Sequence, residues 1–188
     1  SKPKTAASLT MLGRTLIPQG KLQEASQVLT RALAIREHVF GPDHPSVAST
    51  LNEIARVAQK EKRFDAAEAG FSRMLAIYRR AYDDKHYLIG LAINNLGAIE
   101  MDRGRPAAAE PRFREALRRY AATLPADHAF IGIAKLRLGR SLLQQKRFEE
   151  ALAESRAGLD VMLAQSKAPA EWLESGRQDL VAEYTALS

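Results

Sequence analysis

Histidine is the residue type that first suggests chemistry in this chain, because it recurs at a fixed spacing. His44, His86 and His128 lie at equal intervals along the sequence, and imidazole is a common ligand of zinc and other transition metals. If each interval holds two helices about 8–10 Å apart, equivalent residues lie on the order of 20 Å from one another. The ligands of one ion lie about 2 Å from it. The spacing therefore predicts that each histidine caps or packs against the next helix, and we expect no metal site.

Catalytic chemistry finds little support elsewhere in the sequence. In the acidic stretch 148–154, Glu150 and Glu154 are four residues apart, which places them on one solvated face of a helix. No glycine-rich phosphate loop follows a strand, and no arrangement of serine, histidine and aspartate forms a triad. The chain has no cysteine, which excludes disulfides, thiolate metal ligands and a cysteine nucleophile. We expect no enzyme and no cofactor.

Arginine and asparagine give a stronger indication, of binding rather than catalysis. Arg14 and Arg56 are separated by the same interval as the histidines, Arg140 follows Arg56 after two such intervals, and Asn52 and Asn94 share an equivalent position one helical turn earlier. An amide offers donors and an acceptor to an extended backbone, and a guanidinium forks onto a carboxylate. Residues at i, i+4 and i+7 share one face of a helix. The four such faces consist of Thr10, Arg14 and Ile17; Asn52, Arg56 and Gln59; Asn94, Ala98 and Met101; and Leu136, Arg140 and Leu143.

Two interpretations of these faces are open. In the first they bind a guest polypeptide: the amides hold its backbone, the arginines pair with its carboxylates, and an apolar floor takes one or two of its hydrophobic side chains. In the second they only solvate the surface and help neighbouring helices to pack. The binding interpretation assigns the site to Arg14, Asn52, Arg56, Gln59, Asn94, Met101 and Arg140.

The elements that position these residues follow from a 42-residue repeat, which runs four times without insertion or deletion. Each repeat holds two apolar stripes of helical spacing, of which Leu9, Leu12, Gly13 and Leu16 form the first. Glycine in the turn between stripes suits the left-handed residue that ends a helix. In the link 41–45, proline suits the first turn of the next helix. Helices are expected at about 5–18, 22–39, 45–60, 64–81, 87–102, 106–122, 129–144, 148–165 and 170–186.

This pattern predicts four tandem units and one further helix. The units span about 5–41, 42–83, 84–125 and 126–167 within residues 1–168, and the last helix lies in 169–188. That helix keeps the phase of the repeat, so it is either a cap on the last hairpin or the first half of a truncated fifth unit. Trp172 is expected to anchor it against the helix before it.

The repeat closely resembles the tetratricopeptide repeat (TPR), through its Leu-Gly pair, its turn of Gly followed by Lys or Arg, and the Ala, Phe and Ala-Leu that follow. That repeat has about 34 residues, and the extra length here amounts to about two helical turns. The longer form, with its Gly-Pro-Asp-His-Pro link, resembles the repeats of kinesin light chain and their bacterial relatives. HEAT and armadillo arrays have a similar period, but they do not explain the Leu-Gly and Ala-Leu pairs. The resemblance implies an all-α fold, a right-handed superhelical α-solenoid of TPR hairpins whose first helices line a concave groove.

The expected function is that of a non-catalytic protein–protein interaction scaffold that binds an extended, acidic peptide in this groove. The alternative is a regulatory or sensory module of a larger signalling protein, a kinase or a nucleotide-dependent switch, in which the groove holds another segment of the same chain. The net charge of +6 favours acidic partners only weakly. Aromatic residues make up 6% of the chain, too few for nucleic-acid binding along the basic turns. No apolar run approaches the ~18 residues that span a bilayer, and the lack of cysteine fits a cytoplasmic protein.

Overall fold

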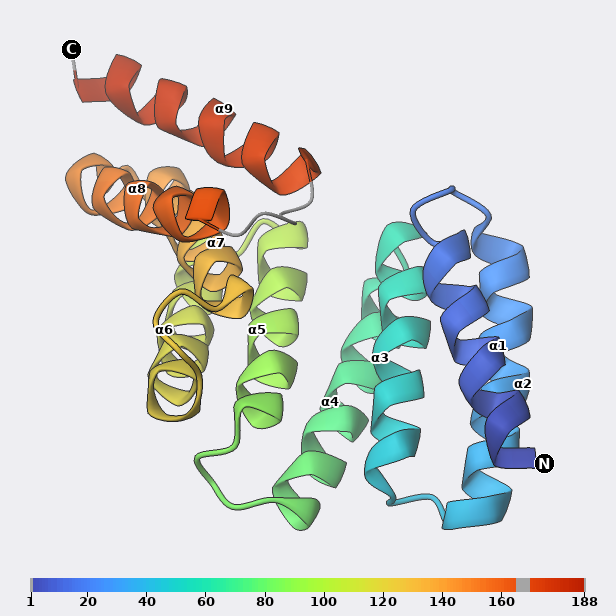
Figure 1. Ribbon diagram of the computed structural model, residues 1–188. Coiled ribbons are helices and arrows are strands. Elements are labelled where there is room, and N and C mark those ends of the chain that lie inside the picture. Colours follow the sequence, from blue (N-terminus) through green and yellow to red (C-terminus); the bar gives the residue numbers. More distant parts are fainter. Residues whose placement is uncertain (1, 165–169, 188) are drawn as a thin grey trace. The chain divides into compact units, whose positions relative to one another are not determined.

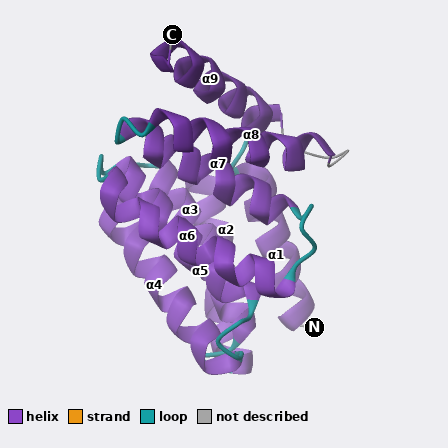
Figure 2. Cartoon of the chain, turned by 90° about the vertical axis from the view of Figure 1, so that its left-hand side faces the viewer, coloured by secondary structure: helices purple, strands orange, loops and turns teal. Residues whose placement is uncertain are grey.

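The computed structural model of the protein describes residues 2–164 and 170–187, and within them all side chains except those of residues 170–173, 183, 184 and 187. These residues form nine α-helices and no strand (Figures 1 and 2). The chain divides into two compact units, residues 1–84 and residues 85–188. The all-α fold expected from the sequence is confirmed.

The first unit consists of two helical hairpins. Helix α1 (Lys2–Leu16) lies against α2 (Leu22–Phe40), and α3 (Pro45–Lys60) lies against α4 (Phe64–Ala81). Helix α3 also contacts both helices of the first hairpin, so the second hairpin covers one side of the first (Figure 1).

The second unit contains two more hairpins and a final helix. Helix α5 (Tyr87–Asp102) pairs with α6 (Pro106–Thr123), and α7 (Ala129–Gln144) pairs with α8 (Phe148–Ala164). Helix α7 also contacts α5 and α6, and α9 (Ala170–Leu187) contacts α7 and α8 in the same way. The last helix therefore takes the place that the first helix of a following hairpin would take.

The helices agree with the expected spans to within three residues, and the largest differences concern α1. This helix begins at Lys2 and ends at Leu16, whereas α3, α5 and α7 extend two positions further in the repeat. Pro18 accounts for the early end, because its ring disfavours helical geometry at Ile17.

The turn inside each hairpin repeats one backbone geometry. The residue at its centre has a positive φ in all four turns: 74° at Gly20, 59° at Lys62, 70° at Gly104 and 63° at Lys146. The next backbone N–H donates to the carbonyl five residues earlier, as from Lys21 to Leu16 at 3.2 Å, which is the Schellman closure of a helix. Glycine was the residue expected here, yet two lysines adopt the same left-handed conformation.

The links before α3, α5 and α7 are closed by the three equally spaced histidines. The Nδ1 atoms of His44, His86 and His128 accept hydrogen bonds of 3.1, 3.2 and 3.1 Å from the backbone N–H two residues further on. Each imidazole thus satisfies one of the unbonded donors at a helix start. The capping role predicted for these residues is confirmed, and the described residues contain no group of three side chains placed to hold a metal ion.

Small residues set how closely the two helices of a hairpin approach. A Cβ atom at Gly13 would lie 2.5 Å from Cγ of Leu29, and one at Gly97 would lie 2.7 Å from Cε1 of Phe113. In the second hairpin the small pair is Ala55 with Gly70, where a Cβ at Gly70 would lie 2.9 Å from that of Ala55. The repeated alanines opposite them are fully buried: Ala25, Ala67, Ala109 and Ala151.

One apolar position expected in the core is exposed. Leu12 is 45% exposed and its neighbour Met11 is 60% exposed, whereas Leu138, the equivalent of Leu12 in α7, is 1% exposed. In the second unit Leu138 packs against Ala109 and Phe113 of the preceding helix α6. Helix α1 has no preceding helix among the described residues, and Leu12 is the member of its apolar stripe that is exposed, whereas Leu16 is 6% exposed.

The division into four units and a final helix stays a prediction, and its last boundary falls in residues 165–169, outside the described residues. The side chain of Trp172 also lies outside them, so its anchoring role is untested.

The turn geometry predicts opposite effects for two matched substitutions. Gly104→Ala is expected to lower the free energy of unfolding by about 1 kcal/mol, because a Cβ atom is unfavourable in the left-handed region. No atom outside Gly104 and its two chain neighbours lies within 4 Å of that Cβ, so the local backbone conformation decides the effect. Lys62→Gly is expected to raise the free energy of unfolding by about 0.5 kcal/mol, the greater entropy of unfolded glycine offsetting part of the gain. Urea unfolding measures both changes in the free energy of unfolding. Changes of the same sign would contradict the conclusion that residues 62 and 104 share the left-handed conformation.

Candidate peptide-binding surface

A buried carboxylate lies at the centre of the candidate surface in the first unit. The Glu53 side chain on α3 is 2% exposed and receives two guanidinium groups. Nε of Arg14, on α1, lies 2.9 Å from its Oε1, and Nη1 of Arg56 lies 2.8 Å from its Oε2. The amide of Asn52 donates to the same Oε1 at 3.1 Å. Glu53 therefore joins two neighbouring helices and fixes the positions of both arginines.

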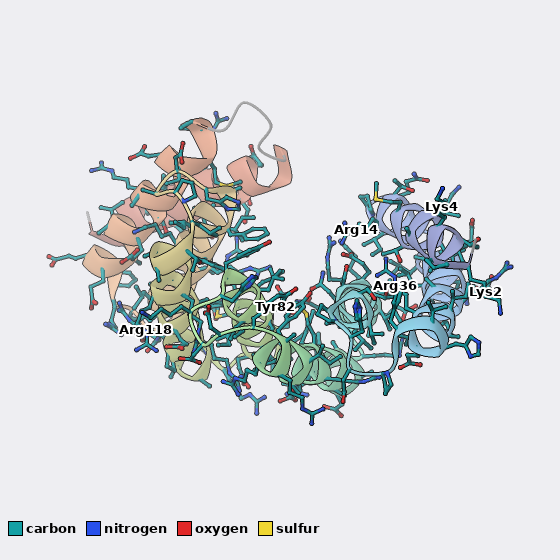
Figure 3. All side chains as sticks on the ribbon, turned by 60° about the horizontal axis from the view of Figure 1, so that its bottom comes forward. Lys2, Lys4, Arg14, Arg36, Tyr82 and Arg118 are labelled. Atoms are coloured by element: carbon teal, nitrogen blue, oxygen red, sulfur yellow. The ribbon has the colours of Figure 1, made fainter. Side chains whose placement is uncertain are left out.

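Both arginines remain open to solvent on the side away from Glu53. Their side chains are 46% and 45% exposed, and Figure 3 shows Arg14 projecting from α1 on the side where α3 lies. A guanidinium has five N–H donors, of which each arginine uses one on Glu53. Two positive charges at the surface thus lie above one negative charge that solvent does not reach.

The other residues of the predicted site in this unit lie around this group. Gln59 is partly buried, one turn beyond Arg56 on α3. The remaining members of the α1 face are packing residues: Thr10 is 4% exposed and donates to the carbonyl of Ala6, and Ile17 is 1% exposed.

Arg140 in the second unit is paired in the same way, with α9. Its Nη2 lies 2.9 Å from Oδ2 of Asp179, and it also donates to the hydroxyl of Ser175. Arg14 and Glu53 are 39 residues apart, and so are Arg140 and Asp179. One repeat length later, Arg56 is the equivalent of Arg14 and Ala182 is the equivalent of Arg140. In both cases the acidic partner lies three positions before that equivalent. Helix α9 follows the contact pattern of the repeat.

Asn94 and Met101 on α5 are less open. Asn94 is 2% exposed, and its Oδ1 has no hydrogen-bond partner in the described structure. The guanidinium of Arg137 on α7 donates to the Asn94 carbonyl and to Oδ1 of Asn95, with long distances of 3.5 and 3.4 Å. Met101 packs against the α6–α8 core. These two residues of the predicted site help helices to pack, as the second interpretation of the faces proposed.

Arg137 also affects a buried tyrosine nearby. Tyr120 on α6 is 0% exposed, and no partner for its hydroxyl is found in the part of the chain that the structure describes. Burial raises the pKa of Tyr120 well above its usual range, and the positive charge of Arg137 partly opposes this. The phenol is therefore neutral at physiological pH.

Sequence reasoning found the arginines but missed the acidic residues that hold them. Glu53 and Asp179 are three repeat lengths apart, and they share their repeat position with Asn95 and Arg137. A comparison of charge at that position across the repeats would have indicated contacts between neighbouring hairpins.

Comparison with known proteins agrees with the repeat geometry. The sequence profile of the tetratricopeptide repeat matches residues 4–80, 46–122 and 88–164, three overlapping stretches that begin one repeat length apart. The chain belongs to the tetratricopeptide repeat family. As a TPR protein it is a protein–protein interaction module with protein or peptide partners, and the fold is generally a non-enzymatic scaffold.

Several solved structures share the fold. One is a crystal structure of TPR-like repeats from Podosopora anserina, which are named for kinesin light chain and are nearly identical to one another. It has a TM-score of 0.76 and 19% identity to this chain, and the match covers 100% of this chain and 88% of that one. BtubC (BKLC) from P. vanneervenii has a TM-score of 0.81 and 16% identity over 99% of this chain and 74% of that one. The apo form of RapI has a TM-score of 0.77 and 15% identity over 100% of this chain and 49% of that one. Curated proteins gave no match to the sequence.

Within residues 2–164 and 170–187, no helix is both long enough and apolar enough to cross a bilayer.

The shared carboxylate predicts non-additive effects on stability. Arg14→Ala and Arg56→Ala each leave Glu53 with one guanidinium, whereas the double variant leaves a buried carboxylate with none. We expect the double variant to lose at least about 1 kcal/mol more than the sum of the single losses, because an uncompensated buried charge is costly. Urea unfolding of the four proteins measures this coupling.

Arg79 on α4 is exposed and supplies the control, since Arg14→Ala combined with Arg79→Ala should be additive. Additivity in the Arg14 and Arg56 cycle would show that Glu53 does not couple the two arginines.

Proposed function

We propose that the TPR protein binds an extended, acidic peptide, and that Arg14 and Arg56 on the first unit pair with its carboxylates. The observation that carries the proposal is the buried Glu53, which holds two half-exposed guanidinium groups on neighbouring helices. A guest carboxylate can accept from the guanidinium N–H groups that Glu53 does not use, and charged hydrogen bonds of this kind are strong.

The preorganisation of the arginines supports binding. A free arginine side chain loses about 2 kcal/mol of rotamer freedom when it is fixed, but the contact with Glu53 already restricts these two. The cost of ordering them on binding is correspondingly lower. Asn52 and Gln59 lie beside them on α3, where their amides are the candidate partners of a guest backbone. Asn94, Met101 and Arg140 belong to the second unit, and their part in peptide binding stays a prediction.

A second function is favoured by the α9 contact. Asp179 and Ser175 of the chain itself already bind the guanidinium of Arg140. A segment of the same polypeptide is therefore a suitable partner for the equivalent arginines Arg14 and Arg56. This supports the alternative of a regulatory or sensory module in a larger signalling protein, whose own segment occupies the site. Such a protein would bind an added acidic peptide only in competition with that segment.

The proposal predicts a charge-specific loss of binding. A fluorescein-labelled peptide rich in Asp and Glu should bind more tightly than a peptide in which these are replaced by Asn and Gln, and its affinity should fall as salt rises. Arg56→Glu is expected to weaken the acidic peptide by at least about tenfold, because it replaces an attractive charge with a repulsive one. Fluorescence anisotropy measures each dissociation constant.

The matched control is Arg79→Glu, which makes the same charge change on α4 of the same unit. Circular dichroism melting checks that each variant is folded, and Arg56→Gln repeats the test without placing a second carboxylate beside Glu53. If Arg56→Glu and Arg79→Glu weaken binding equally, the effect is one of net charge and the assigned surface is wrong.

A further inference from the structure

One arginine of the first unit is held only by neutral groups. Arg36 on α2 is partly buried, and its Nη1 donates to the carbonyl of Ser46 at 2.5 Å and to the hydroxyl of Thr50 at 2.8 Å. Both acceptors lie on α3. No carboxylate among the described residues forms an ion pair with Arg36. A partly buried charge without a counter-ion is unfavourable, so an anion from outside the chain would stabilise this position.

The other hairpins fill the position of Arg36 with an uncharged core residue. Its counterparts at intervals of one repeat length are all buried: Tyr78, Tyr120 and Met162. The counterparts of Thr50 are Ala92 and Ala134, both 0% exposed. In the second unit Tyr120 packs against Ala134, where the first unit has the contact of Arg36 with Thr50. The fold therefore does not require a charge at this position.

The charged groups of this unit follow one face of α3. Ser46, Thr50 and Glu53 are spaced i, i+4 and i+7, which places them on a single face of that helix. Arg36 reaches the first two of these residues, and Arg14 reaches the third. Figure 3 shows Arg14 and Arg36 on the side of the first hairpin where α3 lies. The two guanidinium groups are therefore neighbours, although they come from different helices.

This row of groups carries more positive than negative charge. Three arginines belong to it: Arg14, Arg36 and Arg56. Among the described residues, Glu53 supplies the one carboxylate that pairs with any of them. Burial lowers the pKa of Arg36, the positive charge of Arg14 lowers it further, and Tyr78 partly opposes both. Arginine nevertheless stays protonated in proteins, so the row holds an excess of two positive charges.

The row is open to a group that enters from solvent. Arg14 and Arg56 are half exposed, and Arg36 is partly exposed. Arg14 links the other two, because it shares Glu53 with Arg56 and its charge acts on Arg36. A guanidinium has five N–H donors, and Arg14 uses one of them on Glu53. An anion against Arg14 can therefore bind without displacing a protein contact.

We propose that the guest peptide carries a phosphorylated serine or threonine, whose phosphate accepts hydrogen bonds from Arg14, Arg36 and Arg56. This inference rests on the proposed function, since it names the anion that the same surface takes. The phosphate carries about −1.5 to −2 charges at pH 7 and has three strong acceptor oxygens. It therefore matches both the charge excess and the number of guanidinium groups. A carboxylate has a single charge and two oxygens, so it leaves Arg36 without a counter-ion.

Three labelled peptides test the proposal. They share one sequence rich in Asp and Glu and differ at a central position, which is serine, glutamate or phosphoserine. Fluorescence anisotropy with the whole chain should give the phosphoserine peptide a dissociation constant at least about tenfold below that of the glutamate peptide. The gain is expected because the phosphate adds charge-assisted hydrogen bonds to a third guanidinium.

Arg36→Tyr removes the charge with the residue that the second and third hairpins carry at this position, so the variant should fold. It should reduce the preference for phosphoserine to about twofold or less and leave the affinity for the glutamate peptide within about twofold of the parent value. Circular dichroism melting checks the fold, and Arg36→Met, the residue of the fourth hairpin, repeats the test. The matched control is Arg31→Tyr, which removes an exposed charge from the same helix and should keep the preference.

The outcomes separate this inference from the proposed function. Equal binding of the phosphoserine and glutamate peptides, or a preference that Arg36→Tyr keeps, would overturn the phosphate site and leave the acidic-peptide proposal intact. If Arg56→Gln does not weaken the glutamate peptide, the proposed function is wrong instead. The absence of binding by all three peptides would refute both.

Discussion

The close approach of two helices at one small residue is the constraint on which the structure depends. At Gly13, Gly97 and Gly139 a Cβ atom would overlap a side chain of the facing helix. The second hairpin meets the same requirement with Ala55 and Gly70. Because the two helices of each hairpin approach closely at these small residues, the larger side chains beside the contact fill the remaining space between the helices.

The second interaction that recurs joins a hairpin to the helix that follows it. An arginine on the first helix of the hairpin reaches an acidic residue on that following helix, as in Arg14 with Glu53 on α3 and Arg140 with Asp179 on α9. The carboxylates are largely buried and the arginines half exposed. One contact therefore both connects the hairpins and holds a positive charge at the surface. In a family of interaction modules, the residues that stabilise the stack can thus also form the recognition surface.

The first and last helices show that burial of the repeated apolar stripe depends on a neighbouring helix. Helix α9 lies on the last hairpin as the first helix of a further repeat would, and its Leu180 packs against Leu136 and Met162. Helix α1 has no helix on its outer side among the described residues, and Leu12 is exposed there. The equivalent residues are core at one place and surface at another, although the local sequence pattern is the same.

The sequence by itself determined the period, the helices, the turns and the histidine caps, because each depends on residues close together in the chain. It did not determine that Lys62 and Lys146 adopt the left-handed conformation in place of glycine, since the closure of the hairpin imposes it. Nor did it determine which residues of the predicted site are accessible. Asn94 is 2% exposed, and the arginines are held by carboxylates on α3 or α9, the helix that follows their own hairpin, or on the same helix. Burial and charge pairing depend on which residues from distant parts of the chain lie close together in space. Only the tertiary structure decides that.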